Sequence, residues 1–142
     1  MSETTDTQNL RDQRTAYALL RIILGTNILI HGLSRLIAGS SQFAAKLIPQ
    51  LSHTPLPLSL VYSFGLILPW GELLFGLLLL IGLRTRAAIV GGSVLMLLLT
   101  FGSAMAQDWN AASIQLTYAA IYSALLFLIR YNGWSLDTLL GR

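Results

Sequence analysis

Three ionisable side chains lie within long apolar stretches of this sequence, Arg21, His31 and Glu72. In the hydrocarbon of a membrane an ionised group costs roughly 2.5 to 3.5 kcal/mol, so each needs a partner, a water-filled cavity or a function. At about 1.5 Å per helical residue, Glu72 lies roughly 15 Å from the nearer end of its stretch, close to a bilayer midplane. An unpaired carboxylate there would take up a proton, and we interpret Glu72 as a functional residue.

Two polar stripes at helical spacing accompany these groups. Asn27, His31, Ser34 and Arg35 recur at i, i+4, i+7 and i+8, which places them on one helical face. Gln115, Tyr118 and Tyr122 form a second stripe at i, i+3 and i+7. Such faces point inward in a membrane protein, and together they predict an outward-opening pocket. The candidate ligand-binding residues are Glu72, His31, Arg21, Asn27, Arg35, Gln115, Tyr118 and Tyr122; no catalytic residue is assigned.

The partner of Glu72 stays open at this point, because Asn27, Arg21, His31 or a bound ligand could each reach it. Structural roles compete with functional ones. Arg21 is close enough to its helix end to extend its charge to the membrane surface. His31 suits a hydrogen-bonded packing position, and the tyrosines suit packing or interfacial anchoring.

The elements that carry these residues are long apolar runs. The 142-residue chain is 54% hydrophobic and 11% charged, which disfavours a water-soluble domain. Its hydrophobic residues gather into four runs near the roughly 20 residues that a membrane-spanning helix needs. The alternating pattern of a membrane barrel is absent. We therefore predict an all-α integral membrane four-helix bundle.

The predicted spans are residues 17–37, 58–83, 87–106 and 111–129, within a transmembrane domain of residues 16–130. Residues 1–15 are predicted to be a disordered tail and residues 131–142 a polar tail. Residues 38–57 form a structured loop, in which 43–48 make either a short amphipathic helix or an ordinary connection. Pro69 predicts a tilt or kink in the second span.

Basic residues near the span ends set the orientation, because cytoplasmic flanks hold the excess. On one side lie Arg11, Arg14, Arg84, Arg86, Arg130 and Arg142, and on the other lie Arg35 and Lys46. Both termini are thus predicted to be cytoplasmic, in the inner membrane if the source is bacterial.

Composition also excludes some chemistry. The sequence has no cysteine, so it carries no disulfide, thiolate metal site or dithiol relay. Its two histidines are isolated and make no metal or haem motif. The net charge of +3 comes from basic residues beside the apolar runs rather than from a patch, so no nucleic-acid partner is expected.

Residues 19–25 (Leu-Leu-Arg-Ile-Ile-Leu-Gly) and 30–36 (Ile-His-Gly-Leu-Ser-Arg-Leu) lie in the first predicted span. They resemble the opening helix of the DoxX family of small four-helix membrane proteins. Residues 71–76 and 80–88 resemble the family's second helix and cytoplasmic turn, and residues 132–137 resemble its C-terminal tail. Family members occur in redox contexts: one is a subunit of a thiosulfate:quinone oxidoreductase, and others are linked to thiol and oxidative-stress systems.

The resemblance implies a membrane subunit of a redox system, in which the bundle binds a quinone or small lipophilic ligand and a partner protein supplies the redox cofactor. Glu72 and His31 would exchange protons with the bound group, Arg21 or Arg35 would set the local charge, and a tyrosine would hydrogen-bond or stack. The alternative is a non-enzymatic scaffold or assembly factor, with Glu72 and Arg21 as a structural ion pair. A small permease is disfavoured because no matched pair of broken helices is visible. Homo-oligomerisation through glycine-rich helix faces is a further expectation.

Overall fold

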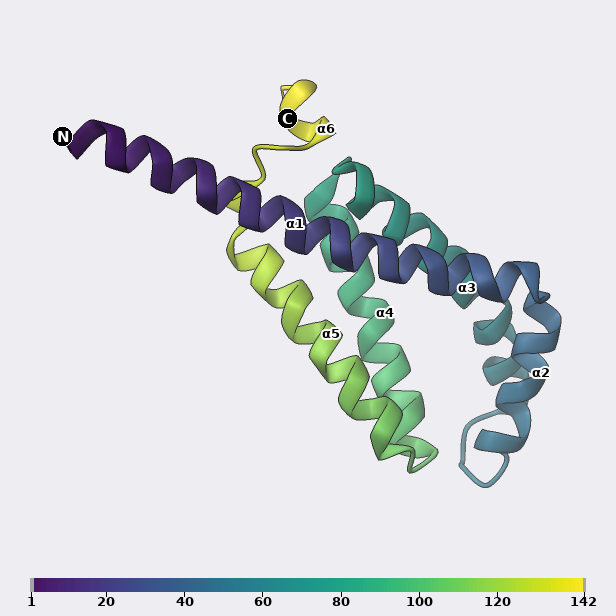
Figure 1. Ribbon diagram of the computed structural model, residues 1–142. Coiled ribbons are helices and arrows are strands. Elements are labelled where there is room, and N and C mark those ends of the chain that lie inside the picture. The colour runs from purple at the N-terminus through teal and green to yellow at the C-terminus, as the bar shows by residue number, and fades with distance from the viewer. Residues whose placement is uncertain (1, 142) are drawn as a thin grey trace.

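The computed structural model describes residues 2–141, with side-chain environments from residue 6, and these residues form helices joined by short turns. Figure 1 shows their arrangement. The elements are α1 (Ser2–Ile37), α2 (Ser40–Leu51), α3 (Leu58–Ile81), α4 (Thr85–Met105), α5 (Trp109–Phe127), the 3-10 turn η1 (Ile129–Tyr131) and α6 (Leu136–Leu139).

Three of these helices are long and apolar enough to cross a membrane. They are residues Asp6–Ile37 of α1, Leu58–Ile81 and Thr85–Met105. The fourth predicted span is present as the helix α5. However, α5 is not among the helices that are apolar enough to count as a candidate span. The all-helical membrane fold is thus confirmed, whereas the fourth crossing and the side on which the termini lie remain predictions.

The N-terminal segment is helical, which corrects the prediction of a disordered tail over residues 1–15. Residues 2–15 continue α1 without interruption, and Met1 lies outside the described residues. No proline occurs before Pro49 and the first glycine is Gly25, so nothing in this segment breaks a helix. Extending an existing helix avoids the unfavourable nucleation step, so the first membrane helix can propagate into a polar segment.

The connection after α1 adopts the helical alternative, and the helix is longer than residues 43–48. α2 packs along α3 where a glycine admits it: a Cβ on Gly65 would lie 2.7 Å from the Cα of Ala44. Pro49 lies inside the last turn of α2, and Pro57 precedes the first residue of α3. α3 itself continues as a helix through Pro69.

The helices associate chiefly in two pairs. α1 packs along α3, and α4 packs along α5 as a hairpin, whereas α1 and α5 touch each other little (Figure 1). Buried side chains from both pairs meet in one core, formed by Tyr17, Leu24, Ile28, Leu79, Ala88, Ile89, Met96, Tyr122 and Leu125. The chain after α5 returns to the end of α3, so the C-terminal segment is docked rather than free.

Glycines set the distance between α1 and α3. A Cβ on Gly32 would lie 2.5 Å from the backbone nitrogen of Leu73, and one on Gly25 would lie 2.7 Å from that of Leu80. From the other side, a Cβ on Gly76 would collide with the backbone of Leu29. Small residues allow helix backbones to approach closely in membranes, where packing drives association. These glycines therefore allow the close contact between α1 and α3 within one chain.

We expect Gly32→Ala and Gly76→Ala to destabilise the protein by about 1–3 kcal/mol each, because the added methyl meets backbone that cannot move without separating the helices. Thermal unfolding in detergent measures the loss. The control is Gly102→Ala, since a Cβ on Gly102 meets nothing within 4 Å. If all three variants unfold at the same temperature, α1 and α3 can move apart at no cost in stability, and the prediction is wrong.

Candidate intramembrane polar site

The centre of the polar site is an ion pair between α1 and α3. Nη1 of Arg35 donates to Oε1 of Glu72, and Glu72 is 2% exposed. The second carboxylate oxygen, Oε2, is buried and has no hydrogen-bond partner among the described residues. The Arg35 guanidinium also lies over the ring of Phe43 on α2, 4.6 Å from its centroid. The pair therefore keeps one unused acceptor inside the protein.

This pairing corrects the sequence expectation, in which Asn27, Arg21 or His31 was to meet Glu72. Arg35 lies on the same face of α1 as Asn27 and His31, and its longer side chain reaches Glu72. Arg21 is elsewhere: its guanidinium donates to the carbonyls of Leu79 and Leu80 at the end of α3 and to that of Trp134. With 2% of its surface exposed, Arg21 does not extend to the membrane surface either.

Helix geometry explains why Arg21 binds the end of α3 and not Glu72. Arg21 precedes Arg35 by fourteen residues, which is roughly 21 Å along α1. The last carbonyls of a helix lack partners within it, and a guanidinium offers several donors to satisfy them. Arg21 thus binds the C-terminal end of α3, while Arg35 binds its middle.

The remaining candidates are divided between two regions. Asn27 accepts a hydrogen bond from the Tyr118 hydroxyl at 3.1 Å, which connects α1 to α5. His31 is exposed on α1, one turn before Arg35. Tyr122 is fully buried and its hydroxyl has no partner among the described residues. Gln115 instead donates to the Ser103 hydroxyl on α4 at 2.9 Å, away from this group.

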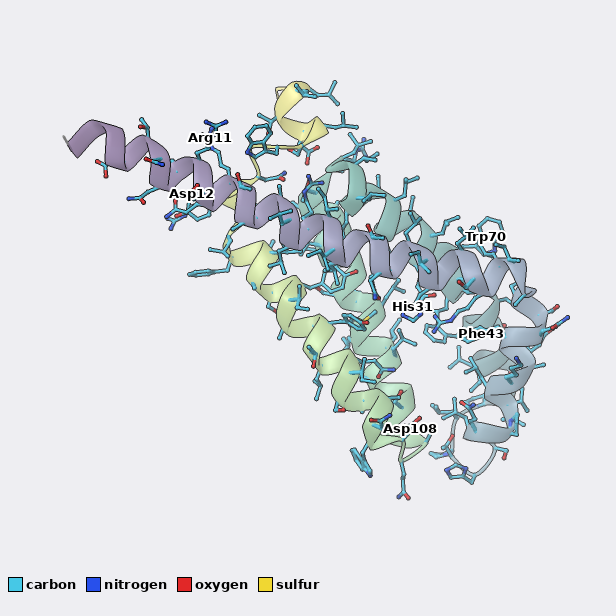
Figure 2. All side chains as sticks on the ribbon, viewed as in Figure 1. Arg11, Asp12, His31, Phe43, Trp70 and Asp108 are labelled. Carbon is cyan, nitrogen blue, oxygen red and sulfur yellow. The ribbon has the colours of Figure 1, made fainter. Side chains whose placement is uncertain are left out.

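A cavity of about 370 Å³ lies next to the ion pair, between α2, α3 and α4. Its wall is mostly apolar and includes Phe43, Phe64, Leu68, Leu98, Phe101 and Gly102. Phe43 is shared by the cavity and Arg35, and Leu68 lies one helical turn before Glu72. In Figure 2, Asp108, which also lines the cavity, lies at the far end of the α4–α5 hairpin. Glu72 itself does not line the cavity.

The C-terminal segment supplies a helix cap that sequence reasoning missed. Both carboxylate oxygens of Asp137 accept backbone N–H groups at the start of α4, from Arg84 at 2.6 Å and Thr85 at 2.7 Å. Asp137 in turn donates its backbone N–H to the Gly82 carbonyl at 2.9 Å. The N-cap residue of α4, Arg84, makes no capping bond with its own side chain. This missing local cap was the only sign in the sequence that a distant residue caps α4.

The chain is thus an all-helical membrane protein whose first two long helices are joined by an intramembrane ion pair. Residues 16–104 match the profile of the DoxX family, and the chain belongs to that family. The match confirms the resemblance seen in the sequence, although it ends before α5, so the likeness at residues 132–137 lies outside it. No curated protein and no solved structure matches the chain.

Removing one member of the ion pair should destabilise the protein more than removing both. We expect Arg35→Met alone to cost roughly 3 kcal/mol, because it leaves the buried Glu72 carboxylate without its partner, and Glu72→Leu to cost less, because Arg35 is partly exposed. The double variant Arg35→Met/Glu72→Leu should recover part of that loss. Reversible unfolding in detergent completes the double-mutant cycle, and strictly additive losses would mean that the two side chains do not interact.

Proposed function

We propose that this DoxX-family protein is the membrane subunit of a redox system and binds a quinone, or a lipophilic ligand of similar shape, in the cavity between α2, α3 and α4. The observation that carries the proposal is the apolar cavity whose wall residue Phe43 contacts Arg35, the partner of the buried Glu72 carboxylate, which has one oxygen unused. In this proposal α5 is a fourth span, both termini face the cytoplasm, and the protein lies in the cell membrane.

The size and lining of the cavity suit such a ligand. Small-molecule sites are typically clefts of about 300–1,000 Å³ with apolar walls and a few polar groups, and this one has about 370 Å³. Its polar members are few: Gln50, Ser103 and Asp108. Leu60 and Phe101 line the cavity and are also exposed on the outside of the helices. A ligand dissolved in the bilayer could enter between them.

The ion pair supplies the acid–base chemistry in this proposal. Reduction of a quinone takes two electrons and two protons, and the partner protein's cofactor would supply the electrons. Glu72 would hold and transfer a proton, and Arg35 would stabilise the carboxylate after transfer. His31, one turn away on α1 and exposed, would return a proton to Glu72 from outside. Asn27 and Tyr118 already hydrogen-bond each other and would position α5 rather than bind the ligand.

A scaffold role is the second candidate, and one observation favours it. Residues 6–16 form an exposed helical extension of α1 beyond the apolar stretch, which a partner protein could contact. In that reading the structural ion pair is Arg35–Glu72, and the cavity has no ligand. The two candidates differ in whether filling the cavity matters.

Filling the cavity should abolish quinone binding without disturbing the ion pair. We expect Gly102→Phe to prevent binding of a short-chain quinone analogue to the purified protein in nanodiscs, measured by isothermal titration calorimetry. Leu97→Phe is the matched control, since Leu97 is exposed on the same helix and does not line the cavity. Glu72→Gln should lower quinone-linked activity, because the amide cannot hold and transfer a proton.

Parent protein that binds no quinone, either alone or with its co-purified partner, would refute this function. Binding that Gly102→Phe leaves intact would place the ligand elsewhere. A partner retained by Gly102→Phe but lost on deletion of residues 2–14 would support the scaffold instead.

A further inference from the structure

A second hollow lies at the opposite end of the molecule and is basic rather than apolar. It has a volume of about 420 Å³ and is lined by Thr7, Leu10, Arg11, Arg14, Gly133 and Trp134. One wall is the N-terminal part of α1, and the other is the segment between η1 and α6. No residue of the intramembrane site contributes to it. We propose that this hollow binds the phosphate headgroup of an anionic phospholipid in the leaflet on the side of the two termini.

The two walls are held in place by contacts between distant parts of the chain. The Trp134 carbonyl accepts from Nη2 of the buried Arg21 at 2.6 Å. Arg14 packs on Gly133 so closely that a Cβ there would lie 2.7 Å from the arginine Cδ. The hollow is therefore part of the folded structure, since the same arginine that binds the end of α3 also fixes the position of Trp134.

Charge favours an anion in this hollow. Arg11 and Arg14 share a helix face at i and i+3, and both are exposed. Neither forms an ion pair within the described part of the chain. Figure 2 shows Arg11 directed toward the C-terminal segment and Asp12 directed to the other side of α1. The nearest acid on the C-terminal segment, Asp137, accepts from the backbone of α4.

Depth favours a lipid as the source of that anion. The apolar stretch of α1 begins at Tyr17, so Arg14 and Arg11 lie roughly 4.5 and 9 Å beyond it along the helix. The headgroup layer of a bilayer extends about 5–8 Å on each side of the hydrocarbon. Trp134 and Leu10 are both about half exposed. An indole at the interface and an apolar neighbour suit the glycerol and upper acyl region, with the guanidiniums at the phosphate.

Trp134 also provides the measurement. In a Trp70→Phe/Trp109→Phe background it is the remaining tryptophan, and its fluorescence reports contact with lipids brominated on the upper acyl chain. The full chain is reconstituted in phosphatidylcholine nanodiscs with increasing brominated phosphatidylglycerol or, separately, brominated phosphatidylcholine. We expect phosphatidylglycerol to quench Trp134 at much lower mole fraction, and Arg11→Gln/Arg14→Gln to reduce this preference by about thirtyfold.

The matched control is Arg84→Gln/Arg86→Gln, which removes the same charge from the α3–α4 turn outside the hollow and should leave most of the preference intact. Equal losses in the two double variants would show diffuse attraction to the surface and overturn the proposal. So would equal quenching by both lipids in the parent. Release of phosphatidylglycerol by millimolar inorganic phosphate, but not by sodium chloride of equal ionic strength, would assign the hollow to a free anion instead.

Discussion

A charge inside a membrane needs a partner, and both buried or half-buried arginines of α1 find theirs on the same neighbouring helix. Arg21 binds the carbonyls at the end of α3, and Arg35 binds the Glu72 carboxylate in its middle. Between them Gly25 and Gly32 let the two backbones approach closely. Two polar attachments with a close-packed stretch between them fix both the register and the distance of the helix pair.

The other elements are positioned relative to this pair. Arg21 also binds Trp134, and Asp137 then caps the start of α4, so the C-terminal segment joins the turn between α3 and α4. At the other end, Phe43 of α2 lies against Arg35 and forms part of the apolar cavity wall. Each arginine therefore has a structural contact and an adjacent hollow. This arrangement separates the apolar cavity from the basic hollow beside the N-terminal part of α1.

Much of the fold was predictable because it follows from local properties of the chain. Long apolar runs must be helices in lipid, and the predicted spans agree with α3, α4 and α5 to within two residues at each end. The need of Glu72 for a partner follows from its charge and depth alone, and the structure supplies Arg35. The helical extension before Thr15 was missed because polar residues give no apolar periodicity, although nothing among them stops a helix.

The sequence by itself determined the helical membrane class, the positions of α3, α4 and α5, and the presence of ionisable groups within the apolar runs. Only the tertiary structure decided which of those groups meet. Spacing along one helix defines a shared face, but the partner on the next helix depends on how far the two slide and rotate, and here glycine contacts set that register. Residues as distant as Asp137 and Thr85 pair for the same reason, because no local pattern specifies contacts between segments far apart in the chain.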